Sequence, residues 1–298
     1  MRLLCEGRVA VVTGAGRGIG RSEALGLAAA GALVVVNDLG GRSDGTGSSG
    51  EPAHDVVEEI RAAGGEAVAN GDDISDWEGA ERLITLALTT YGRLDVLVNN
   101  AGVLRDRMLV NMTMEDWDQV MRVHLRGAFC PTRHAAEYWR NQSKAGAAVD
   151  ARVINTSSSS GIYGNPGQTN YGTAKAGIAA FTIIASQELS RYGVTVNAVA
   201  PAAATRLTAG LGAVDELSPE RRDALEPRWP AAVVTWLASA ESAGVTGRVI
   251  ESSGLRLTMA EGWRRGPSGE PSDDPEVVGA VIAKLAAESP APEGMLGI

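Results

Sequence analysis

The chain has 298 residues, of which 44% are hydrophobic and 21% charged, and this composition excludes a disordered or fibrous protein. The formal net charge of −9 argues against nucleic acid as the main partner, because phosphate binding needs a basic surface. Two cysteines, Cys5 and Cys130, are too few for a disulfide framework or a cysteine-based metal site, so we expect no metal.

Short apolar runs rich in β-branched residues alternate with longer helical patterns from Arg8 to about Ile250. The runs cover residues 9–12, 32–36, 66–69, 94–98, 152–155, 194–199 and 247–250. Continuously apolar strands are buried on both faces, and the helical stretches supply the right-handed crossovers of a parallel sheet. The pattern predicts an α/β fold, a Rossmann-type doubly wound parallel sheet of about seven strands.

A glycine-rich turn follows the first run and leads into a helix expected over residues 21–30. Such a turn lets the backbone approach a pyrophosphate, while the helix N-terminus offers free N–H groups. A glycine turn without a ligand is the alternative, but the strand before it and the helix after it favour a dinucleotide site. The expected cofactor-binding residues here are Gly14, Gly16, Arg17, Gly18, Ile19 and Gly20.

Asp38 ends the second run, 18 residues beyond Gly20. A carboxylate there would accept hydrogen bonds from the adenosine ribose and repel a 2′-phosphate, which favours NAD over NADP. Arg17 and Arg42 are counter-evidence, because a basic residue would attract that phosphate. Residues 40–52 are rich in glycine, serine and other loop-forming residues. This segment has two interpretations: it contacts the cofactor, or it is a mobile surface insert.

Polar and small residues follow the third and fourth runs. Ligands of open α/β sheets bind at the carboxyl ends of the strands, so we expect these residues to contact the cofactor. Ordinary turn chemistry is the alternative for each stretch. The residues are Asp73, Ile74, Asn100, Ala101 and Gly102.

Tyr171 and Lys175 share one face at the start of a long helix, four residues apart. A nearby ammonium favours the phenolate of a tyrosine and makes it a usable proton-transfer group. Upstream, the serine run 157–160 offers hydroxyls that would orient an alcohol or a carbonyl. Taken singly, a Tyr/Lys pair is more often a surface pair, and a serine run is more often a solvated loop. Their joint occurrence after a dinucleotide site in the sequence favours catalysis.

These motifs resemble the short-chain dehydrogenase/reductase family over about residues 7–250. The resemblance rests on Thr13-Gly14-x-x-x-Gly18-x-Gly20, on Asn99-Asn100-Ala101-Gly102, on Ser158 placed 13 residues before the tyrosine, and on Tyr171-x-x-x-Lys175. It implies that Tyr171 is the acid/base, that Ser158 holds the reacting oxygen, and that Lys175 binds the nicotinamide ribose and lowers the tyrosine pKa. The family's usual reaction is hydride exchange between an alcohol and nicotinamide.

Within that family the chain looks like the (3R)-hydroxyacyl-CoA dehydrogenase units of peroxisomal multifunctional enzymes, also called 17β-hydroxysteroid dehydrogenases type 4, and their bacterial relatives. The matching stretches are residues 34–41, 102–107, 122–127 and 160–165. The match implies NAD and a 3-hydroxyacyl-CoA or hydroxysteroid substrate. It also implies a homodimer or homotetramer formed through helices near residues 114–139 and 170–191.

The chain departs from the family pattern at three places. His124 stands where the family has a fourth catalytic residue, asparagine; an imidazole there would hold a relay water or simply pack in the core. Pro201 and Ala202 replace the Pro-Gly turn at the nicotinamide, and Arg206 replaces a threonine. Residues 264–298 match no family pattern, and they would cover a neighbouring subunit or extend into solvent.

The sequence therefore predicts an NAD-dependent oxidoreductase that oxidises a secondary alcohol, a (3R)-hydroxyacyl-CoA or a hydroxysteroid. The alternatives are a 3-oxoacyl thioester reductase, disfavoured by Asp38, and a non-catalytic dinucleotide-binding regulator. Residues 1–263 are expected to form the catalytic domain and residues 264–298 an extension with one helix over 275–288. No membrane span or secretory signal is evident, so we expect a cytoplasmic protein.

Apolar and basic side chains near the site bear on the substrate without identifying it. Leu207, Leu211 and Leu217 would cover a lipid-like group, although they would serve equally as helix core. Arg105, Arg107 and Arg206 would meet coenzyme A phosphates, although exposed arginines are more often only solvated.

Overall fold

Parallel strands with buried side chains on both faces form the centre of the molecule. The structure, a computed structural model, describes residues 3–42, 44–204, 217–291, 293 and 294. The sheet order is β3-β2-β1-β4-β5-β6-β7-β8, and every pairing is parallel except that of β7 with β8. The strands are β1 Val9–Thr13, β2 Leu33–Asn37, β3 Glu66–Asn70, β4 Val96–Asn99, β5 Ala151–Thr156, β6 Val194–Pro201, β7 Val249–Ser252 and β8 Leu257–Ala260.

The predicted fold class is confirmed, and a strand lies at each of the seven predicted runs. The eighth strand, β8, was missed. Leu257 and Met259 on it are exposed, and among the described residues it pairs only with β7, so it lacks the continuous apolar run that identifies an inner strand. Its antiparallel return needs only a tight turn instead of a crossover helix.

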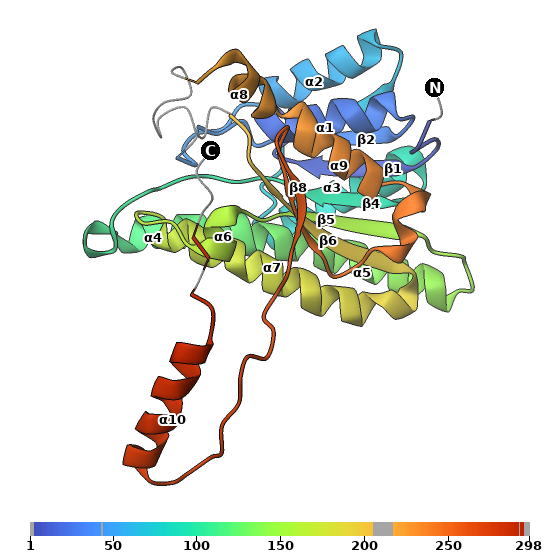
Figure 1. Ribbon diagram of the computed structural model, residues 1–298. Coiled ribbons are helices and arrows are strands. Elements are labelled where there is room, and N and C mark those ends of the chain that lie inside the picture. The colour runs from blue at the N-terminus through green and yellow to red at the C-terminus, as the bar shows by residue number, and fades with distance from the viewer. Residues whose placement is uncertain (1–2, 43, 205–216, 292, 295–298) are drawn as a thin grey trace.

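Helices cover both faces of the sheet (Figure 1). On one face α1 Gly18–Ala29 packs against α2 Glu51–Ala62 and α9 Arg228–Leu237. On the other, α3 Trp77–Tyr91 packs against α5 Gly127–Lys144, and α7 Thr169–Leu189 packs along β5 and β6. The remaining helices are α4 Met114–Met121, α6 Ser159–Tyr163, α8 Pro219–Ala224 and α10 Pro275–Glu288, with short helical turns at Leu109–Asn111, Arg122–Arg126, Ser190–Tyr192 and Ala240–Gly244.

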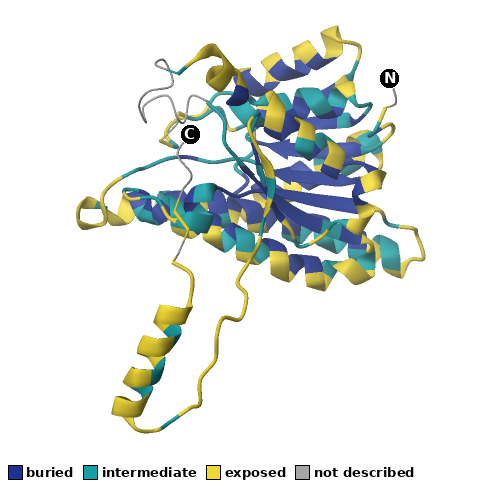
Figure 2. Ribbon diagram, viewed as in Figure 1, coloured by how far each residue is buried: buried dark blue, intermediate teal, exposed yellow. Residues whose placement is uncertain are grey.

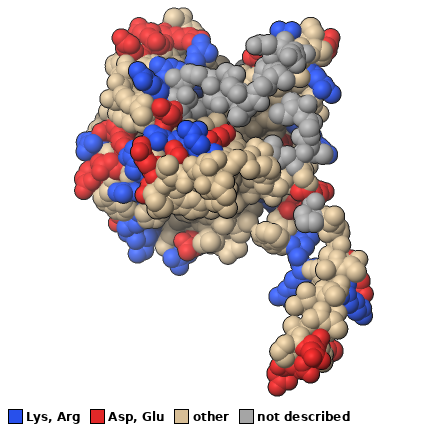
Figure 3. All heavy atoms as spheres, turned by 90° about the vertical axis from the view of Figure 1, so that its left-hand side faces the viewer, with Lys and Arg blue, Asp and Glu red and all other residues tan. Residues whose placement is uncertain are grey.

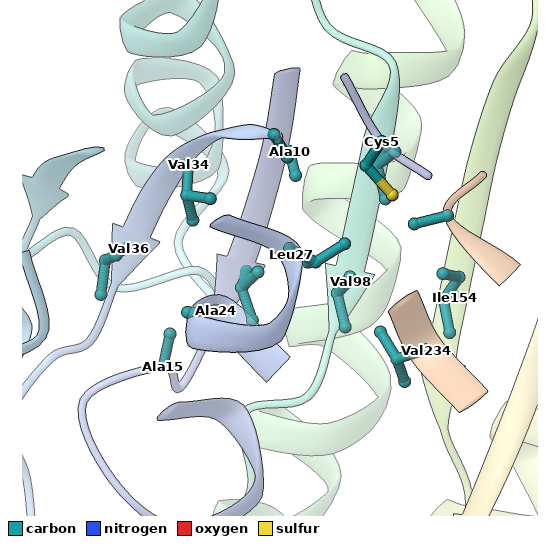
Figure 4. Packing of buried hydrophobic residues seen from close by; sticks show 14 of the residues in the cluster. Cys5, Ala10, Ala15, Ala24, Leu27, Val34, Val36, Val98, Ile154 and Val234 are labelled. Atoms are coloured by element: carbon teal, nitrogen blue, oxygen red, sulfur yellow. The ribbon is translucent and has the colours of Figure 1, made fainter. Parts of the chain in front are cut away.

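The two largest hydrophobic clusters fix these layers to the sheet. In the first, Ala24 and Leu27 of α1 meet Val98, Ile154 and the α9 residue Val234 (Figure 4). In the second, helices α3, α5 and α7 pack on the opposite face of the same strands. Burial on both faces explains why the central strands are the darkest part of Figure 2.

The C-terminal segment extends away from the sheet and its helices. Residues 261–271 are all exposed, and α10, predicted over the same residues, has no buried side chain and projects away from the sheet (Figures 1 and 2). Its N-cap is Asp274, whose carboxylate accepts a hydrogen bond from the Glu276 N–H.

The order in which strands are added to the sheet reverses between β1 and β4. After β1 the chain builds outward through β2 and β3, then returns to place β4 on the other side of β1. Parallel sheets open a crevice at the carboxyl ends of the strands at such a reversal, and this crevice positions the site.

Candidate active site

A crevice at the carboxyl ends of β1 to β4 collects most of the residues predicted to bind a cofactor. It is lined by Gly14, Arg17, Gly18, Ile19, Gly20, Asp38, Asp73, Ile74, Asn100, Ala101 and Gly102. Five other predicted residues do not line it, namely Gly16, Tyr171, Lys175, Pro201 and Ala202. The crevice therefore corresponds to the dinucleotide part of the prediction, and the catalytic part lies beside it.

The glycine turn has room for main chain only. A Cβ atom on Gly14 would lie 2.6 Å from the Cα of Ala101, and one on Gly20 would lie 2.3 Å from the Asn100 amide nitrogen. Gly14 and Gly18 also adopt φ values of 63° and 55°, which disfavour larger residues. Helix α1 begins here without a side-chain cap, so its first N–H groups are free for an anionic group.

Asn100 holds the turn from the neighbouring strand. Its side-chain amide donates hydrogen bonds to the main-chain oxygens of Thr13 at 2.9 Å and Gly14 at 3.1 Å. The Thr13 hydroxyl in turn accepts from the N–H groups of Asn100 and Ala101. The Asn100 side chain thus fixes the shape of the crevice.

Asp38 ties the end of β2 to the glycine turn. Its carboxylate accepts hydrogen bonds from the N–H of Gly16 at 2.8 Å and of Gly40 at 2.6 Å. Arg17 donates to the main-chain oxygen of Gly41, so its guanidinium is directed toward the loop. Asp38 therefore stands at the crevice as an anchored carboxylate.

The glycine-rich loop after β2 lies over the crevice. Gln119 of α4 donates to the main-chain oxygen of Gly45, and Arg105 donates to that of Asp44. Gly41, Arg42 and Gly45 of the loop line the crevice. Of the two interpretations of this segment, the structure favours the one in which it contacts a bound ligand.

Asp73 forms part of the wall of the crevice. It accepts hydrogen bonds from Ser75 and from Arg122, the latter at 2.8 Å. Burial opposes the ionisation of Asp73, but these hydrogen bonds outweigh burial and hold its pKa below the ordinary value. The turn places Ile74 against Gly127, where a Cβ atom would lie 2.8 Å from the isoleucine Cδ1.

Ser158, Tyr171 and Lys175 come together where β5 ends and α7 begins. Lys175 is 2% exposed, and its ammonium donates to the main-chain oxygen of Thr156 at 2.6 Å. The same nitrogen lies 5.5 Å from the centre of the Tyr171 ring. Ser158 is the N-cap of α6, and its hydroxyl accepts from the Ser160 N–H at 3.1 Å.

Burial disfavours the charged form of both the tyrosine and the lysine. It raises the pKa of Tyr171 to about 12; a hydrogen bond with Ser158 opposes the rise and the charge of Asp106 adds to it. Burial lowers the pKa of Lys175 to about 7, against the opposing charge of Glu23. Where burial disfavours both charges, a phenolate on Tyr171 and an ammonium on Lys175 would stabilise each other, which couples their proton transfers.

Glu23 was missed in the sequence. It is 1% exposed on α1, and its Oε2 atom has no hydrogen-bond partner among the described residues. Burial raises its pKa to about 8, opposed by the charge of Lys175. The available signal was its spacing, because Glu23 falls on the apolar face of α1 with Gly20, Ala24 and Leu27.

His124 lies in a π-helical turn, Arg122–Arg126, between α4 and α5. Its ring is 2% exposed, with Nε2 at 2.9 Å from the Val103 carbonyl oxygen, and it meets the Tyr171 ring edge-on at 5.2 Å between centres. A Cβ on Gly102 would lie 2.5 Å from the histidine Cε1. Burial lowers the pKa of His124 to about 3, so the ring is neutral, and its buried Nδ1 has no partner among the described residues.

Other predicted residues lie elsewhere or outside the description. Pro201 pairs with Ser252 at the end of β6, and the N–H of Ala202 donates to the main-chain oxygen of Ser252. Arg206, Leu207 and Leu211 lie outside the described residues. Within the described ranges, no cluster of three or more His, Cys, Asp or Glu side chains is placed to hold a metal, and no helix there could span a membrane.

Charges of both signs intermingle on the side of the molecule shown in Figure 3. Acidic and basic side chains alternate there with uncharged areas and do not form a continuous basic surface.

Comparisons with known proteins agree with this geometry. The family model described as short chain dehydrogenase matches residues 8–214. Hydroxyacyl-CoA dehydrogenase ChsB1 of Mycobacterium tuberculosis is 47% identical over 261 residues, covering 85% of this chain and 80% of that protein. Peroxisomal multifunctional enzyme type 2 of Mus musculus is 46% identical over 232 residues, 78% of this chain but only 30% of the larger enzyme.

A solved structure matches nearly the whole chain. The crystal structure of a short chain dehydrogenase from Mycobacterium avium is 49% identical, with a TM-score of 0.88, and the match covers 99% of this chain and 100% of that one. The likeness therefore extends over the C-terminal segment as well as the sheet.

Proposed function

Because the chain belongs to the short-chain dehydrogenase family, we propose that it oxidises the alcohol of a (3R)-3-hydroxyacyl-CoA thioester with NAD. Membership makes the protein an oxidoreductase that acts on CH–OH groups with a nicotinamide dinucleotide. The thioester substrate is inferred from the resemblance to hydroxyacyl-CoA dehydrogenase ChsB1. A hydroxysteroid is the second substrate class that we consider.

The crevice fits a dinucleotide. Gly14 and Gly20 let the turn pack directly against Ala101 and Asn100, and the uncapped start of α1 adjoins the crevice that these glycines line. Gly18, Ile19 and the residues after β3 and β4 would line the bound cofactor. When bound, the nicotinamide accepts the hydride.

Asp38 supports the choice of NAD. Its anchored carboxylate at the end of β2 would accept hydrogen bonds from the adenosine ribose and repel a 2′-phosphate. Arg17 is directed to Gly41, which weakens the case for it as a phosphate clamp, while Arg42 does line the crevice. This placement also disfavours the alternative of an NADPH-dependent 3-oxoacyl thioester reductase.

The catalytic step is assigned to the residues at the start of α7. Tyr171 would take the hydroxyl proton as the C–H hydride leaves the same carbon, and Ser158 would hold the reacting oxygen. Lys175, anchored to Thr156 on the strand that leads to Ser158, would lower the cost of forming the phenolate. This joint placement of Ser158, Tyr171 and Lys175 beside the crevice is the observation that carries the proposal.

His124 is assigned a positioning role. As a neutral buried ring held by Val103, it packs edge-on against Tyr171. Its Nδ1, which has no partner among the described residues, would accept a hydrogen bond from a relay water or donate one to it. A non-catalytic regulator would have no need for this arrangement, because dinucleotide binding alone does not require the tyrosine or the lysine.

We also propose that the catalytic domain spans residues 1–263, with 264–298 as an extension, and that the protein forms a homodimer or homotetramer. Phe129 on α5 and Ile183 and Ile184 on α7 are exposed on the helices expected to pair. Size-exclusion chromatography with light scattering would measure the number of subunits.

NADH formation followed by absorbance tests the proposed reaction. The substrates are a (3R)-hydroxyacyl-CoA, its (3S) epimer and a 17β-hydroxysteroid, each with NAD and with NADP. We expect turnover of the (3R) thioester with NAD, and none by Tyr171→Phe. Activity on the steroid alone, or with NADP alone, would contradict the substrate or cofactor assignment while leaving the catalytic residues in place.

A further inference from the structure

A half-buried carboxylate lies against the start of α7, next to the proposed catalytic residues. Asp106 accepts a hydrogen bond from the side-chain amide of Gln168 at 2.8 Å. Gln168 is the N-cap residue of α7, and its amide oxygen accepts from the Ser160 hydroxyl at 2.8 Å. Because Gln168 lies three residues before Tyr171, both side chains lie on one side of the helix.

The second carboxylate oxygen of Asp106 has no partner in the part of the chain that the structure describes. Its Oδ1 atom is buried and accepts no hydrogen bond among the described residues. The neighbouring Arg107 is exposed, and its guanidinium donates to the main-chain oxygen of Asp106. Arg105 is engaged by Glu115 and Asp116. No ion pair among the described residues therefore neutralises Asp106.

The Asp106 charge acts on the residue that would perform the proton transfer. Its negative charge is one of the causes that raise the pKa of Tyr171. Burial raises the pKa of Asp106 itself, while Gln168 and Arg107 limit the rise. A half-buried charge that has no ion pair among the described residues is only partly screened, so it also acts on a ligand beside the tyrosine.

We propose that Asp106 is a specificity-determining residue that rejects substrates with a carboxylate near the reacting carbon and thereby selects neutral acyl thioesters. The inference rests on the proposed function, which places the hydroxyl carbon at Tyr171. In a free 3-hydroxy acid the carboxylate stands two bonds from that carbon, whereas a thioester carries no charge there. Repulsion between two carboxylates in a partly desolvated site discriminates against the acid.

The test compares one acyl group in two charge states. Specificity constants are measured with NAD for (3R)-hydroxybutyrate and for its neutral N-acetylcysteamine thioester, at about pH 8, where ordinary carboxylic acids are ionised. Asp106→Asn keeps the size and the acceptor for Gln168 but removes the charge. Asp106→Glu keeps the charge, and Asp118→Asn removes a charge from an exposed position on α4.

We expect Asp106→Asn to raise the acid-to-thioester ratio of kcat/KM by about tenfold or more. Asp106→Glu and Asp118→Asn should keep the ratio of the native protein. An unchanged ratio in Asp106→Asn, or an equal loss for both substrates, would overturn the proposal. Inactivity of the native protein on both substrates would refute the proposed function instead.

Binding of the free acid gives a second readout that does not need turnover. Both proteins carry Tyr171→Phe as well, which prevents turnover, and calorimetric titration of (3R)-hydroxybutyrate into them with saturating NAD should give a lower Kd with Asp106→Asn than without it. Equal Kd values would overturn the role of Asp106 whatever the enzyme's activity.

Discussion

The ammonium nitrogen of Lys175 lies 5.5 Å from the centre of the Tyr171 ring and donates a 2.6 Å hydrogen bond to the main-chain oxygen of Thr156. The lysine is therefore fixed to β5 two residues before Ser158, while its place on α7 fixes it relative to the tyrosine. Ser158, Tyr171 and Lys175 therefore have one defined arrangement. Burial nevertheless opposes the negative charge of a Tyr171 phenolate and the positive charge of the Lys175 ammonium.

Tyr171→Phe is expected to reduce alcohol oxidation by about 100-fold or more, since general acid–base groups contribute ~10² to 10⁴. The ring and its contact with His124 remain, so the fold should survive. NADH absorbance measures turnover, and quenching of protein fluorescence measures dinucleotide affinity. Loss of both together would indicate disrupted folding and not a missing proton-transfer group.

The parts of this arrangement that depend on the main chain were predictable from the sequence. The glycine turn has its spacing because Gly14 and Gly20 face Ala101 and Asn100 with no room for a Cβ atom. The inner strands were predictable because both of their faces are apolar. Asp38 was identified because the end of β2 has a fixed place relative to that turn.

Other features depend on contacts between distant residues. The link from Asp106 to Gln168 joins residues 62 positions apart, and no local pattern indicates that pairing. The burial of Glu23 depends on how α1 packs, and β8 depends on a turn after β7. The π-helical turn around His124 also has no sequence signature of the kind that caps and glycines provide.

His124 makes the stability of the protein sensitive to acid. Its pKa is about 3 in the folded protein against an ordinary 6.5, so the unfolded chain binds the proton more tightly. The contribution of the neutral, buried ring to the free energy of unfolding is complete above about pH 6.5 and is lost as the pH falls toward 3. Between pH 7 and 5 the loss is about 2 kcal/mol of unfolding free energy.

His124→Gln should remove that part of the pH dependence, because glutamine does not titrate and its amide would still reach Val103. Urea unfolding of both proteins at about pH 7 and 5 gives the difference, in which the carboxylates common to both chains cancel. Equal acid sensitivity of the two proteins would show that the imidazole is not buried in its neutral form.

Asp38→Asn is expected to lower the NAD-to-NADP ratio of kcat/KM by about tenfold or more, since the charge that repels a 2′-phosphate is gone. Asparagine keeps one acceptor for the Gly16 or Gly40 N–H, so the turn should hold. Asp55→Asn, an exposed position on α2, is the matched control for net charge. A ratio that falls equally in both variants would assign the preference to overall charge.

Truncation after Trp263 is expected to leave the melting temperature of the remaining body unchanged within about 2 °C. The reason is that α10 buries no side chain, leaving Val277 47% and Ile282 59% exposed, and residues 261–271 are exposed as well. Thermal unfolding followed by circular dichroism measures the stability, and light scattering of the same samples measures the subunit number. A lower melting temperature with fewer subunits would mean that α10 packs on another copy of the chain. A lower melting temperature with the subunit number unchanged would contradict the proposed boundary at residue 263, because the extension would then stabilise the assembled body.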